Sequence, residues 1–401
     1  MKGKPKSKAK LKSRGAAAAS VERGRKNASA RAALPQSTAV ADDELAALRG
    51  RIDAVDERIQ ALIAERAGLA KEVGILKGLK QTVDYYRPER EAQVLRKVVD
   101  RNDGPLRDEE MVRLFRELMS ACLAQEEPLK VAYLGPEGTF TQSAVFKHFG
   151  HSVHALAVPT VDEVFHEVES GTADFGVAPI ENSSEGTVNI HTLDMFLTSP
   201  LKICGEIELR IHQHLMGRMQ DLKDIKRVCS HPQSLAQCRG WLSQHLPDVE
   251  KVPVVSNAEA ARRARDEEGT AALAGEAAAN VYNLRILFNT VEDRDDNTTR
   301  FVVIGRKLFP ASGQDKTSVL VSAAETETPG VLLHLLAPLS KHGVNMTRIE
   351  SRPSRKRKWD YVFFLDLDGH ADDEHVRKAL DAMKAQASLF KVLGSFPKAV
   401  L

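Results

Sequence analysis

The sequence contains few cysteines and no long apolar run. Its four cysteines, Cys122, Cys204, Cys229 and Cys238, form no CxxC pair, so a zinc site is not expected. No stretch of about 18 apolar residues is present, so no membrane span is predicted. The N-terminus lacks the apolar core of a secretory signal. Together these absences predict a protein of the reducing cytoplasm.

Signatures of cofactor binding are also missing. The glycine-rich turn at 135–139 is neither GxGxxG nor a P-loop with its lysine, so we expect no nucleotide and no other cofactor. His212 and His214 alternate with apolar residues, which is typical of the polar face of a strand. We therefore expect no metal.

The N-terminal tail is strongly basic. Residues 1–40 hold eleven lysines or arginines and one glutamate, so the tail carries +10 and the rest of the chain about −8. The tail has almost no large apolar residues and cannot bury enough surface to fold alone. We predict a disordered extension over 1–41 and no nucleic-acid partner. Nucleic-acid binding and a transit peptide are the alternatives for such a composition.

The remaining composition is that of a globular protein with several domains. Hydrophobic residues make up 42% of the chain and charged residues 28%, as in ordinary soluble proteins. The length predicts roughly two to three domains. The hydrophobic periodicity predicts an all-α domain over 42–128, an α/β domain over 129–306 and an α+β domain over 315–401.

A long amphipathic helix opens the first of these segments. Apolar residues step by three and four from Leu45 to Leu76, which predicts one helix over about 42–80. Arg66 fills one slot of this stripe, Lys77 lies near the same face, and Arg49 points elsewhere. A cation in an apolar seam is costly unless it is paired, so a bundle that collects cations favours a small dianion. So long a helix needs a partner, and we predict a homodimer or a higher homo-oligomer.

In the second segment, apolar runs alternate with helical patterns. This rhythm predicts an α/β fold with parallel sheet character and two lobes around a cleft. Polar clusters at 181–186, 230–237 and 297–301 follow or begin predicted strands, where open α/β sheets bind ligands. Taken alone, each cluster is equally consistent with a polar turn that caps a helix, and His231 with a turn histidine.

The third segment has the order βαββαβ, which predicts a ferredoxin-like sandwich. It holds no cluster of a nucleophile with a base, so we expect a regulatory domain. The basic run at 355–358 is interpreted as a solvated hairpin turn.

The first segment resembles the all-helical chorismate mutase family. The similarity is carried by LRGRID, LIAERAGLA, EVGILK, RPERE and FRELMSACLAQE. The resemblance implies a helical dimer in which Arg49 and Arg66 clamp the carboxylates of chorismate. It also implies that Lys77 contacts a carboxylate and the ether oxygen, and Glu91 a substrate hydroxyl. The other implied site residues are Arg87, Arg90, Cys122 and Glu126.

The second segment resembles prephenate dehydratase in four stretches that occur in register. They are GPEGTFTQSA, GVAPIENSSEGTVN, SHPQSLAQC and NTTRFVVIG. The resemblance implies a two-lobed fold like that of periplasmic binding proteins, with prephenate in the cleft losing CO2 and water to give phenylpyruvate. Thr299 is the implied catalytic donor to the leaving hydroxyl, and Arg300 is implied to bind a carboxylate. The other implied substrate-binding residues are Asn182, Ser183, Ser230, Gln237 and Phe301.

The third segment resembles the ACT domain, which binds amino acids. PGVLLHLL and ESRP match the two phenylalanine-binding stretches of the dehydratase version. The resemblance implies that L-phenylalanine is an effector that slows the dehydratase. The implied effector residues are Gly330, Val331, Leu332, Glu350, Ser351, Arg352 and Pro353.

One other function stays open for the second segment. A two-lobed module that senses an aromatic acid without converting it has the same architecture. The run Thr299-Arg300-Phe301 and the cation set of the first segment favour an enzyme. Binding of a ligand without turnover favours the module.

Glu126 generates a prediction about the mutase, in which Lys77 and Glu126 are the implied catalytic residues. Glu126 stands where a glutamine can donate to the ether oxygen, and a carboxyl group donates only when it is protonated. We therefore predict that mutase activity falls as pH rises towards and above neutrality, and that Glu126→Gln flattens the profile. Chorismate consumption across this pH range tests it, and identical profiles for the two proteins contradict it.

Overall fold

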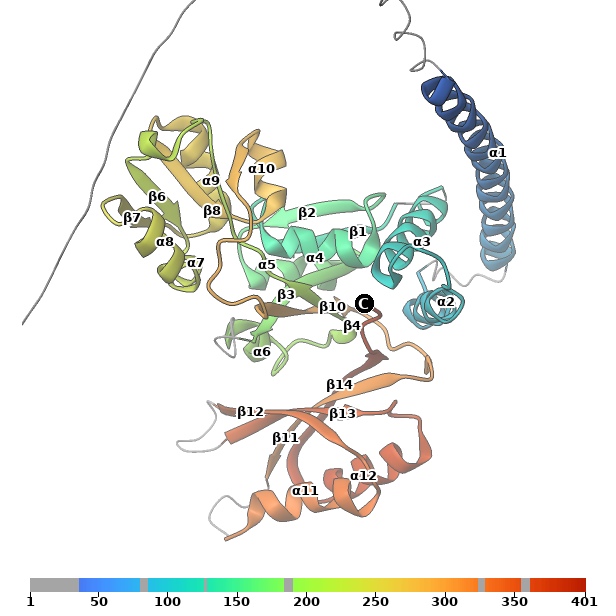
Figure 1. Cartoon of the computed structure of the whole chain (residues 1–401). Coiled ribbons are helices and arrows are strands. Elements are labelled where there is room, and N and C mark those ends of the chain that lie inside the picture. The colour runs from blue at the N-terminus through green and yellow to red at the C-terminus, as the bar shows by residue number, and fades with distance from the viewer. Residues whose placement is uncertain (1–35, 80–85, 126–127, 184–189, 324–328, 355–360) are drawn as a thin grey trace, which may run out of the picture. The chain divides into compact units, whose positions relative to one another are not determined.

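The computed structural model describes residues 36–79, 86–125, 128–183, 190–323, 329–354 and 361–401 (Figure 1). The basic tail up to residue 35, Glu126 and the basic run at 355–358 lie outside these residues. The chain forms two compact units, one up to Glu65 and one from Arg66 to Leu401. Within the described ranges, no helix is long and apolar enough to cross a membrane.

The N-terminal segment is helical, as predicted. Its helices are α1 (Gln36–Leu79), α2 (Pro88–Asp100) and α3 (Asp108–Leu123). The apolar stripe of α1 is exposed in the single chain, with Ile52 at 59% and Leu62 at 61%. Helix α2 begins with Pro88 at its first position, where a missing N–H costs no hydrogen bond.

The first lobe of the α/β segment is built on a five-stranded sheet with the order β2-β1-β3-β10-β4. Strands β1 to β3 are parallel, but β10 runs antiparallel to both β3 and β4. The prediction of parallel strands is therefore wrong for the two pairings that β10 makes, because the chain enters β10 from the other lobe. The elements are β1 (Lys130–Leu134), α4 (Phe140–Phe149), β2 (His154–Val158), α5 (Val161–Ser170), β3 (Phe175–Asn182), α6 (Ile190–Met195), β4 (Lys202–Arg210) and β10 (Thr298–Gly305).

The second lobe has its own sheet, with the order β7-β6-β8-β5-β9. The chain enters this lobe after β4 and leaves it before β10, so two segments join the lobes, as the predicted two-lobed fold requires. The elements are β5 (His214–Gly217), a 3-10 turn (Leu222–Asp224), β6 (Arg227–Ser230), α7 (Pro232–Gln237), α8 (Arg239–His245), β7 (Glu250–Pro253), α9 (Asn257–Asp266), β8 (Thr270–Ala274), α10 (Glu276–Tyr282) and β9 (Arg285–Phe288).

The C-terminal segment has the predicted order βαββαβ, and its sheet has the strand order β12-β13-β11-β14 (Figure 1). Its elements are β11 (Asp315–Ala323), α11 (Val331–Lys341), β12 (Met346–Pro353), β13 (Tyr361–Asp368), α12 (Glu374–Lys384) and β14 (Ala387–Pro397).

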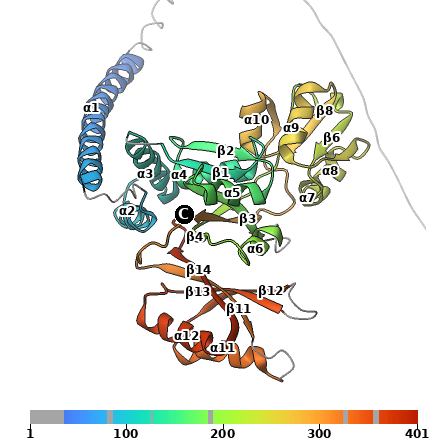
Figure 2. The ribbon, with the colours of Figure 1, turned by 180° about the vertical axis from the view of Figure 1, so that it is seen from behind.

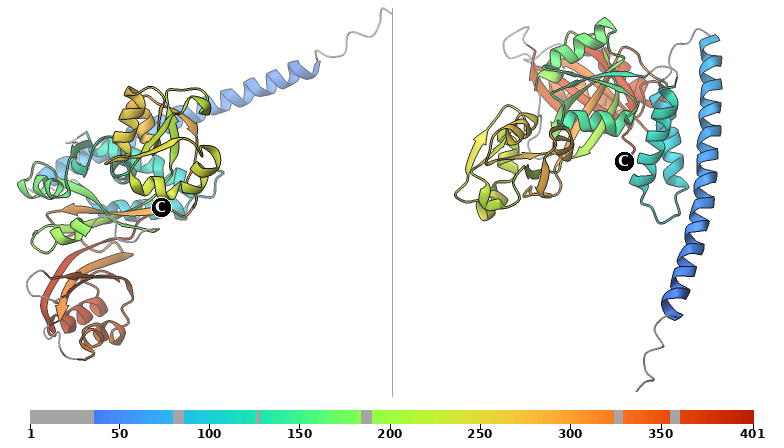
Figure 3. Two further views of the ribbon diagram at one scale, coloured as in Figure 1. Left: turned by 90° about the vertical axis from the view of Figure 1, so that its left-hand side faces the viewer. Right: turned by 90° about the horizontal axis from the view of Figure 1, so that it is seen from above.

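Both faces of this last sheet are buried. Because side chains alternate along a strand, Val319 and Val321 of β11 pack against α11 and α12. Leu320 points the other way and shares a core with Ile203 of β4. The small domain therefore lies with its helices outward and its sheet against the first lobe, which the views from other sides also show (Figures 2 and 3).

Gly394 sets how closely β14 approaches β4. A Cβ atom at this position would overlap the backbone carbonyl of Ile203. The contact is backed by Lys202, whose Nζ donates to the carbonyl of Val392 at 3.0 Å. Only glycine allows the two backbones to come this close.

We predict that Gly394→Ala destabilises the contact between the small domain and the first lobe. Overpacking of this kind costs about 1–3 kcal/mol, so the denaturation midpoint should fall. Gly104→Ala is the matched control, because its Cβ would meet only Asn102 Oδ1 at 3.9 Å. Equal midpoints for the two variants would contradict the prediction.

Candidate functional site

A cavity of about 420 Å³ lies between the two sheets of the α/β segment. The first lobe contributes Asn182, Thr299 and Phe301 to its wall, and the second lobe contributes Gln237 and Asn257. This volume is in the range of small-molecule sites, which usually lie between two lobes. Asn182 and Thr299 lie at the ends of neighbouring strands, as the sequence predicted for this sheet edge.

The pair Asn182–Thr299 is held by the sheet itself. The two residues are register partners in the antiparallel pairing of β3 with β10. Asn182 Nδ2 donates to Thr299 Oγ1 at 2.9 Å, and both residues are buried. Because Oγ1 accepts this bond, the hydroxyl proton of Thr299 is left to be donated to a ligand.

A series of side-chain amides continues from this pair to the second lobe. Asn182 Nδ2 also lies 2.9 Å from Asn297 Oδ1, and Asn297 Nδ2 donates to Gln237 Oε1 at 3.0 Å. Gln213 Nε2 donates to Ser234 Oγ at 3.0 Å, and Asn257 Nδ2 donates to the same oxygen at 2.9 Å. The series fixes these amides at the junction of the two lobes.

Three of the predicted dehydratase residues, Ser183, Ser230 and Arg300, do not line the cavity. Ser230 is fully buried behind it and donates to the carbonyl oxygen of Leu273 at 2.7 Å. Ser230 Oγ also lies 3.1 Å from Asn257 Oδ1, so its contact with the cavity wall is through Asn257. Ser183 is exposed at the rim, where its hydroxyl contacts Asp296 and Thr298.

Arg300 is not brought to the cavity. It follows Thr299 on β10 and therefore points to the opposite face of the sheet. There Arg300 Nη1 lies 2.6 Å from Asp366 of β13, and Arg300 Nε lies 3.0 Å from Glu206 of β4. The expectation that Arg300 clamps a ligand carboxylate directly has no support in this geometry, because both contacts lie outside the cavity.

Gln213 and Asn257 line the cavity, and Asn297 joins Asn182 to Gln237 by hydrogen bonds, but the sequence predicted no role for these three residues. Alternation gives a signal for Gln213, since it lies between His212 and His214 and so faces the other side of the strand. Asn297 lies inside a polar cluster that the sequence singled out. For Asn257 no local signal exists, because its position next to Ser230 arises only from the pairing of distant strands.

The described part of the cavity wall is almost uncharged. Among the described residues that line it there is no lysine and no arginine, and His231 is the one residue that can carry a positive charge. The first turns of α4 and α9 lie at the wall, through Thr139, Phe140 and Asn257. Free N–H groups at helix N-termini favour anions, so the wall can bind a carboxylate with neutral donors.

The predicted mutase residues are placed as follows. Arg66 Nη1 donates to Cys122 Sγ at 3.2 Å, so the structure brings these two together. Arg49 lies in the other compact unit and is exposed. Arg87 pairs with Glu89, and Arg90 is exposed. The side chain of Lys77 and the whole of Glu126 lie outside the described residues.

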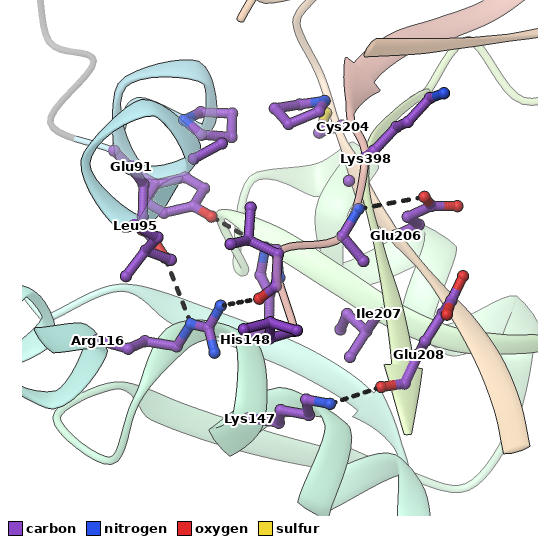
Figure 4. Close-up of a pocket in the computed structure, with 18 residues that line it drawn as sticks. Glu91, Leu95, Arg116, Lys147, His148, Cys204, Glu206, Ile207, Glu208 and Lys398 are labelled. Atoms are coloured by element: carbon purple, nitrogen blue, oxygen red, sulfur yellow. Dashed lines mark hydrogen bonds and ion pairs between the residues drawn. The ribbon is translucent and has the colours of Figure 1, made fainter. Parts of the chain in front are cut away.

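Glu91 lines a different, small cavity of about 40 Å³, which is too small for a substrate (Figure 4). It lies 3.7 Å from Arg116 of α3, and Arg116 also contacts the carbonyl of Val400 in the C-terminal tail. Burial raises the pKa of Glu91 to about 7, although Arg116 opposes the shift. Burial likewise lowers the pKa of His148, on the same wall, to about 3.

The predicted effector residues lie at two places of the small domain. Gly330, in the left-handed region with φ of 80°, precedes α11, and Val331 and Leu332 open that helix half-buried. Glu350, Ser351, Arg352 and Pro353 lie on β12, where Arg352 Nη2 contacts Glu350 Oε1 at 2.9 Å. In the described part of the chain, no group of three or more His, Cys, Asp or Glu side chains gathers as metal ligands do.

The fold and the cleft thus define a class of protein. It is a two-lobed α/β protein with a donor hydroxyl and amides in its cleft, preceded by a helical segment and followed by a ferredoxin-like domain.

Comparison with known proteins matches each segment separately. Models of chorismate mutase type II, prephenate dehydratase and the ACT domain match residues 48–127, 131–308 and 317–385. A bifunctional chorismate mutase/prephenate dehydratase of Pseudomonas aeruginosa is 52% identical over 364 residues, covering 90% of this chain and 99% of the relative. One from Aquifex aeolicus is 46% identical, with 90% and 99% covered. The structure of prephenate dehydratase from Arthrobacter aurescens in complex with L-Phe is 35% identical with a TM-score of 0.63, covering 68% of this chain and 93% of that one.

The chain therefore belongs to the bifunctional chorismate mutase/prephenate dehydratase family. It is an enzyme with both activities, and its ACT domain is of the kind typical of feedback regulation by phenylalanine. The resemblances drawn from the sequence are confirmed at the level of family and fold.

The raised pKa of Glu91 yields a prediction about stability. The folded protein holds this proton more tightly than the unfolded chain, so stability is lost as pH rises from about 4.5 through about 7. A shift of this size corresponds to about 3 kcal/mol. Glu91→Gln should therefore gain stability over the wild type between pH 5 and pH 8, as measured by urea denaturation at both values.

Glu110→Gln is the control for this measurement. Its carboxylate is exposed, and the neighbouring Arg113 lowers its pKa, so this variant should show no such gain. The pKa assignment for Glu91 is wrong if the two variants respond to pH alike.

Proposed function

We propose that Thr299 is the proton donor of the dehydratase reaction and that Asn182 orients it. The hydrogen bond from Asn182 Nδ2 to Thr299 Oγ1 supports this assignment, because it leaves the threonine proton for the substrate. As prephenate reacts, the electron pair of the ring–carboxylate bond passes into the ring and CO2 departs. The ring hydroxyl leaves with the electron pair of the C–O bond and takes the proton of Thr299 to become water, and a proton from solvent restores the Thr299 hydroxyl. Aromatisation drives the step, and a weak acid suffices because the proton moves as the C–O bond breaks.

The neutral donors of the cavity wall hold the substrate. Gln213, Gln237 and Asn257 present amides to the cleft, and Phe301 covers one side of it. The carboxylate that remains on the product lies against the first turns of α4 and α9. Ser230 acts by positioning Asn257, and Ser183 and Arg300 act by fixing the two strands that carry Asn182 and Thr299.

For the mutase we propose that the cations of the helical segment bind the two carboxylates of chorismate. Arg66 and Cys122, which are in contact, form one part of this site with Lys77, Arg87, Arg90, Glu91 and Glu126. Arg49 belongs to the other compact unit and completes the site in a homo-oligomer. The exposed stripe of α1 supports this assembly, because apolar side chains exposed along a whole helix face indicate a missing partner.

L-Phenylalanine is the effector that this proposal assigns to the ACT domain. Its residues would be Gly330, Val331 and Leu332 on one element and Glu350 to Pro353 on another. The protein is expected to act in the cytoplasm, where both substrates are made and used.

We predict that Thr299→Ala lowers dehydratase turnover by about 10²- to 10⁴-fold, the range of a lost general acid, and spares the mutase. Thr298→Ala is the matched control, because Thr298 is the neighbouring residue on the strand and does not line the cavity. Thr299→Ser should retain part of the activity. Phenylpyruvate formation from prephenate and loss of chorismate are the two assays. Equal loss of both activities, or of neither, would contradict the assignment.

A further inference from the structure

A series of ion pairs begins directly behind the catalytic strands. Glu181 and Arg300 each lie one residue from Asn182 and Thr299, and they are register partners across β3 and β10. Their side chains therefore leave the sheet on the face opposite to the cleft. Arg300 Nη1 lies 3.8 Å from Glu181 Oε2. This face is the one covered by the small domain.

The series continues on strand β12 of the small domain. Arg348 Nε lies 2.9 Å from Glu181 Oε2 and so links the two domains. Arg348 Nη2 lies 3.9 Å from Glu350 Oε2, and Arg352 Nη2 lies 2.9 Å from Glu350 Oε1. Alternate residues of β12 carry these groups on one face. The series of ion pairs thus connects the predicted effector residues 350–353 of β12, called the effector stretch below, with strands β3 and β10, which carry Asn182 and Thr299.

The arginines of these ion pairs are shielded from water, whereas the Glu181 side chain is 38% exposed and that of Glu350 is 26% exposed. The side chains of Arg300, Arg348 and Arg352 are only 10–14% exposed. Two charges about 4 Å apart interact by about 4 kcal/mol in surroundings of intermediate polarity, and allosteric coupling typically amounts to 1–3 kcal/mol. Breaking one ion pair therefore changes the free energy of its neighbour by an amount that is sufficient for allosteric coupling.

Arg348 lies between a carboxylate of the first lobe, Glu181, and a carboxylate of the predicted effector residues, Glu350. Its contact with Glu181 is short and its contact with Glu350 is long. In addition, Arg348 Nη2 is buried and makes no hydrogen bond. An amino acid whose ammonium group binds Glu350 competes with Arg348 for that carboxylate. Arg348 then pairs with Glu181 alone, and Glu181 is the residue next to Asn182 in the chain.

We propose that Arg348 and Glu181 transmit occupancy of the effector stretch to Asn182 and Thr299 within one subunit. This inference rests on the proposed regulation by phenylalanine. Arg348 is a positioning residue in it, because it acts on the catalytic pair through Glu181. Exchange of Arg348 between Glu181 and Glu350 is the two-state element that such coupling requires.

The test uses the full chain and four variants, Arg348→Gln, Arg348→Lys, Glu181→Gln and the double variant Glu181→Gln/Arg348→Gln. Dehydratase rates are measured over a range of phenylalanine concentrations, and phenylalanine binding is measured by calorimetry. The mutase rate reports that each variant is folded. Lys378→Gln is the matched control, because it removes an exposed ion pair with Glu374 in the same domain.

We expect Arg348→Gln to bind phenylalanine with nearly unchanged affinity, but its dehydratase rate at saturating phenylalanine should be at least about tenfold higher than that of the wild type, because the bound effector no longer acts on the site. Arg348→Lys should restore part of the response, since it keeps the charge. The double variant should respond no more weakly than either single variant, because both act on one link. Lys378→Gln should behave as the wild type.

Two results would overturn the inference. One is inhibition of Arg348→Gln to the wild-type extent at saturating phenylalanine, and the other is loss of phenylalanine binding in parallel with loss of inhibition. A wild-type enzyme that neither binds phenylalanine nor slows in its presence would instead refute the proposed regulation itself.

Discussion

The placement of β10 between β3 and β4 is the constraint on which the rest of the enzyme depends. Because successive residues of a strand face opposite sides, β10 presents Thr299 to the cleft and Arg300 to the small domain. One strand thus carries the Thr299 hydroxyl on one face and a cation on the other. Its antiparallel register with β3 places Asn182 on the cleft face beside Thr299, and Glu181 on the opposite face beside Arg300.

Glu206 on β4 ties three parts of the chain to this strand. Its carboxylate is buried and lies 3.0 Å from Arg300 Nε and 2.9 Å from Lys316 Nζ of β11. Its Oε1 also accepts from the backbone N–H of Ala399 in the C-terminal tail at 3.2 Å. A buried carboxylate is tolerated only when such partners surround it, so the first lobe, the small domain and the tail must assemble together to satisfy it.

Much of the fold could be predicted from the sequence, because its signals are local. The apolar periodicity predicted α1. The alternation of strand and helix patterns predicted the α/β segment and the small C-terminal domain. The orientation of β10 was not predictable in this way, since it depends on the chain returning from the second lobe.

The residues of the candidate site were predictable only where the signal was local. Strand ends and the family resemblance predicted that Asn182, Gln237 and Thr299 belong to the site. No such signal predicted Asn257, because its position next to Ser230 depends on the pairing of distant strands. The contacts of Arg300 with Glu206 and Asp366 were not predictable either, because they arise from the packing of β10 against β4 and of the small domain against this sheet.

The absence of lysine and arginine among the described residues of the cleft wall has a consequence for turnover. Prephenate enters with two carboxylates and phenylpyruvate leaves with one, so the reaction itself removes half of the charge that the wall must hold. A lysine or arginine in the wall would bind the remaining carboxylate of the product almost as tightly as it binds that carboxylate in the substrate. Amides and helix termini bind an anion through several weak contacts that must all fit at once. Because aromatisation flattens the ring, we expect such a set of contacts to hold the product less firmly than the substrate.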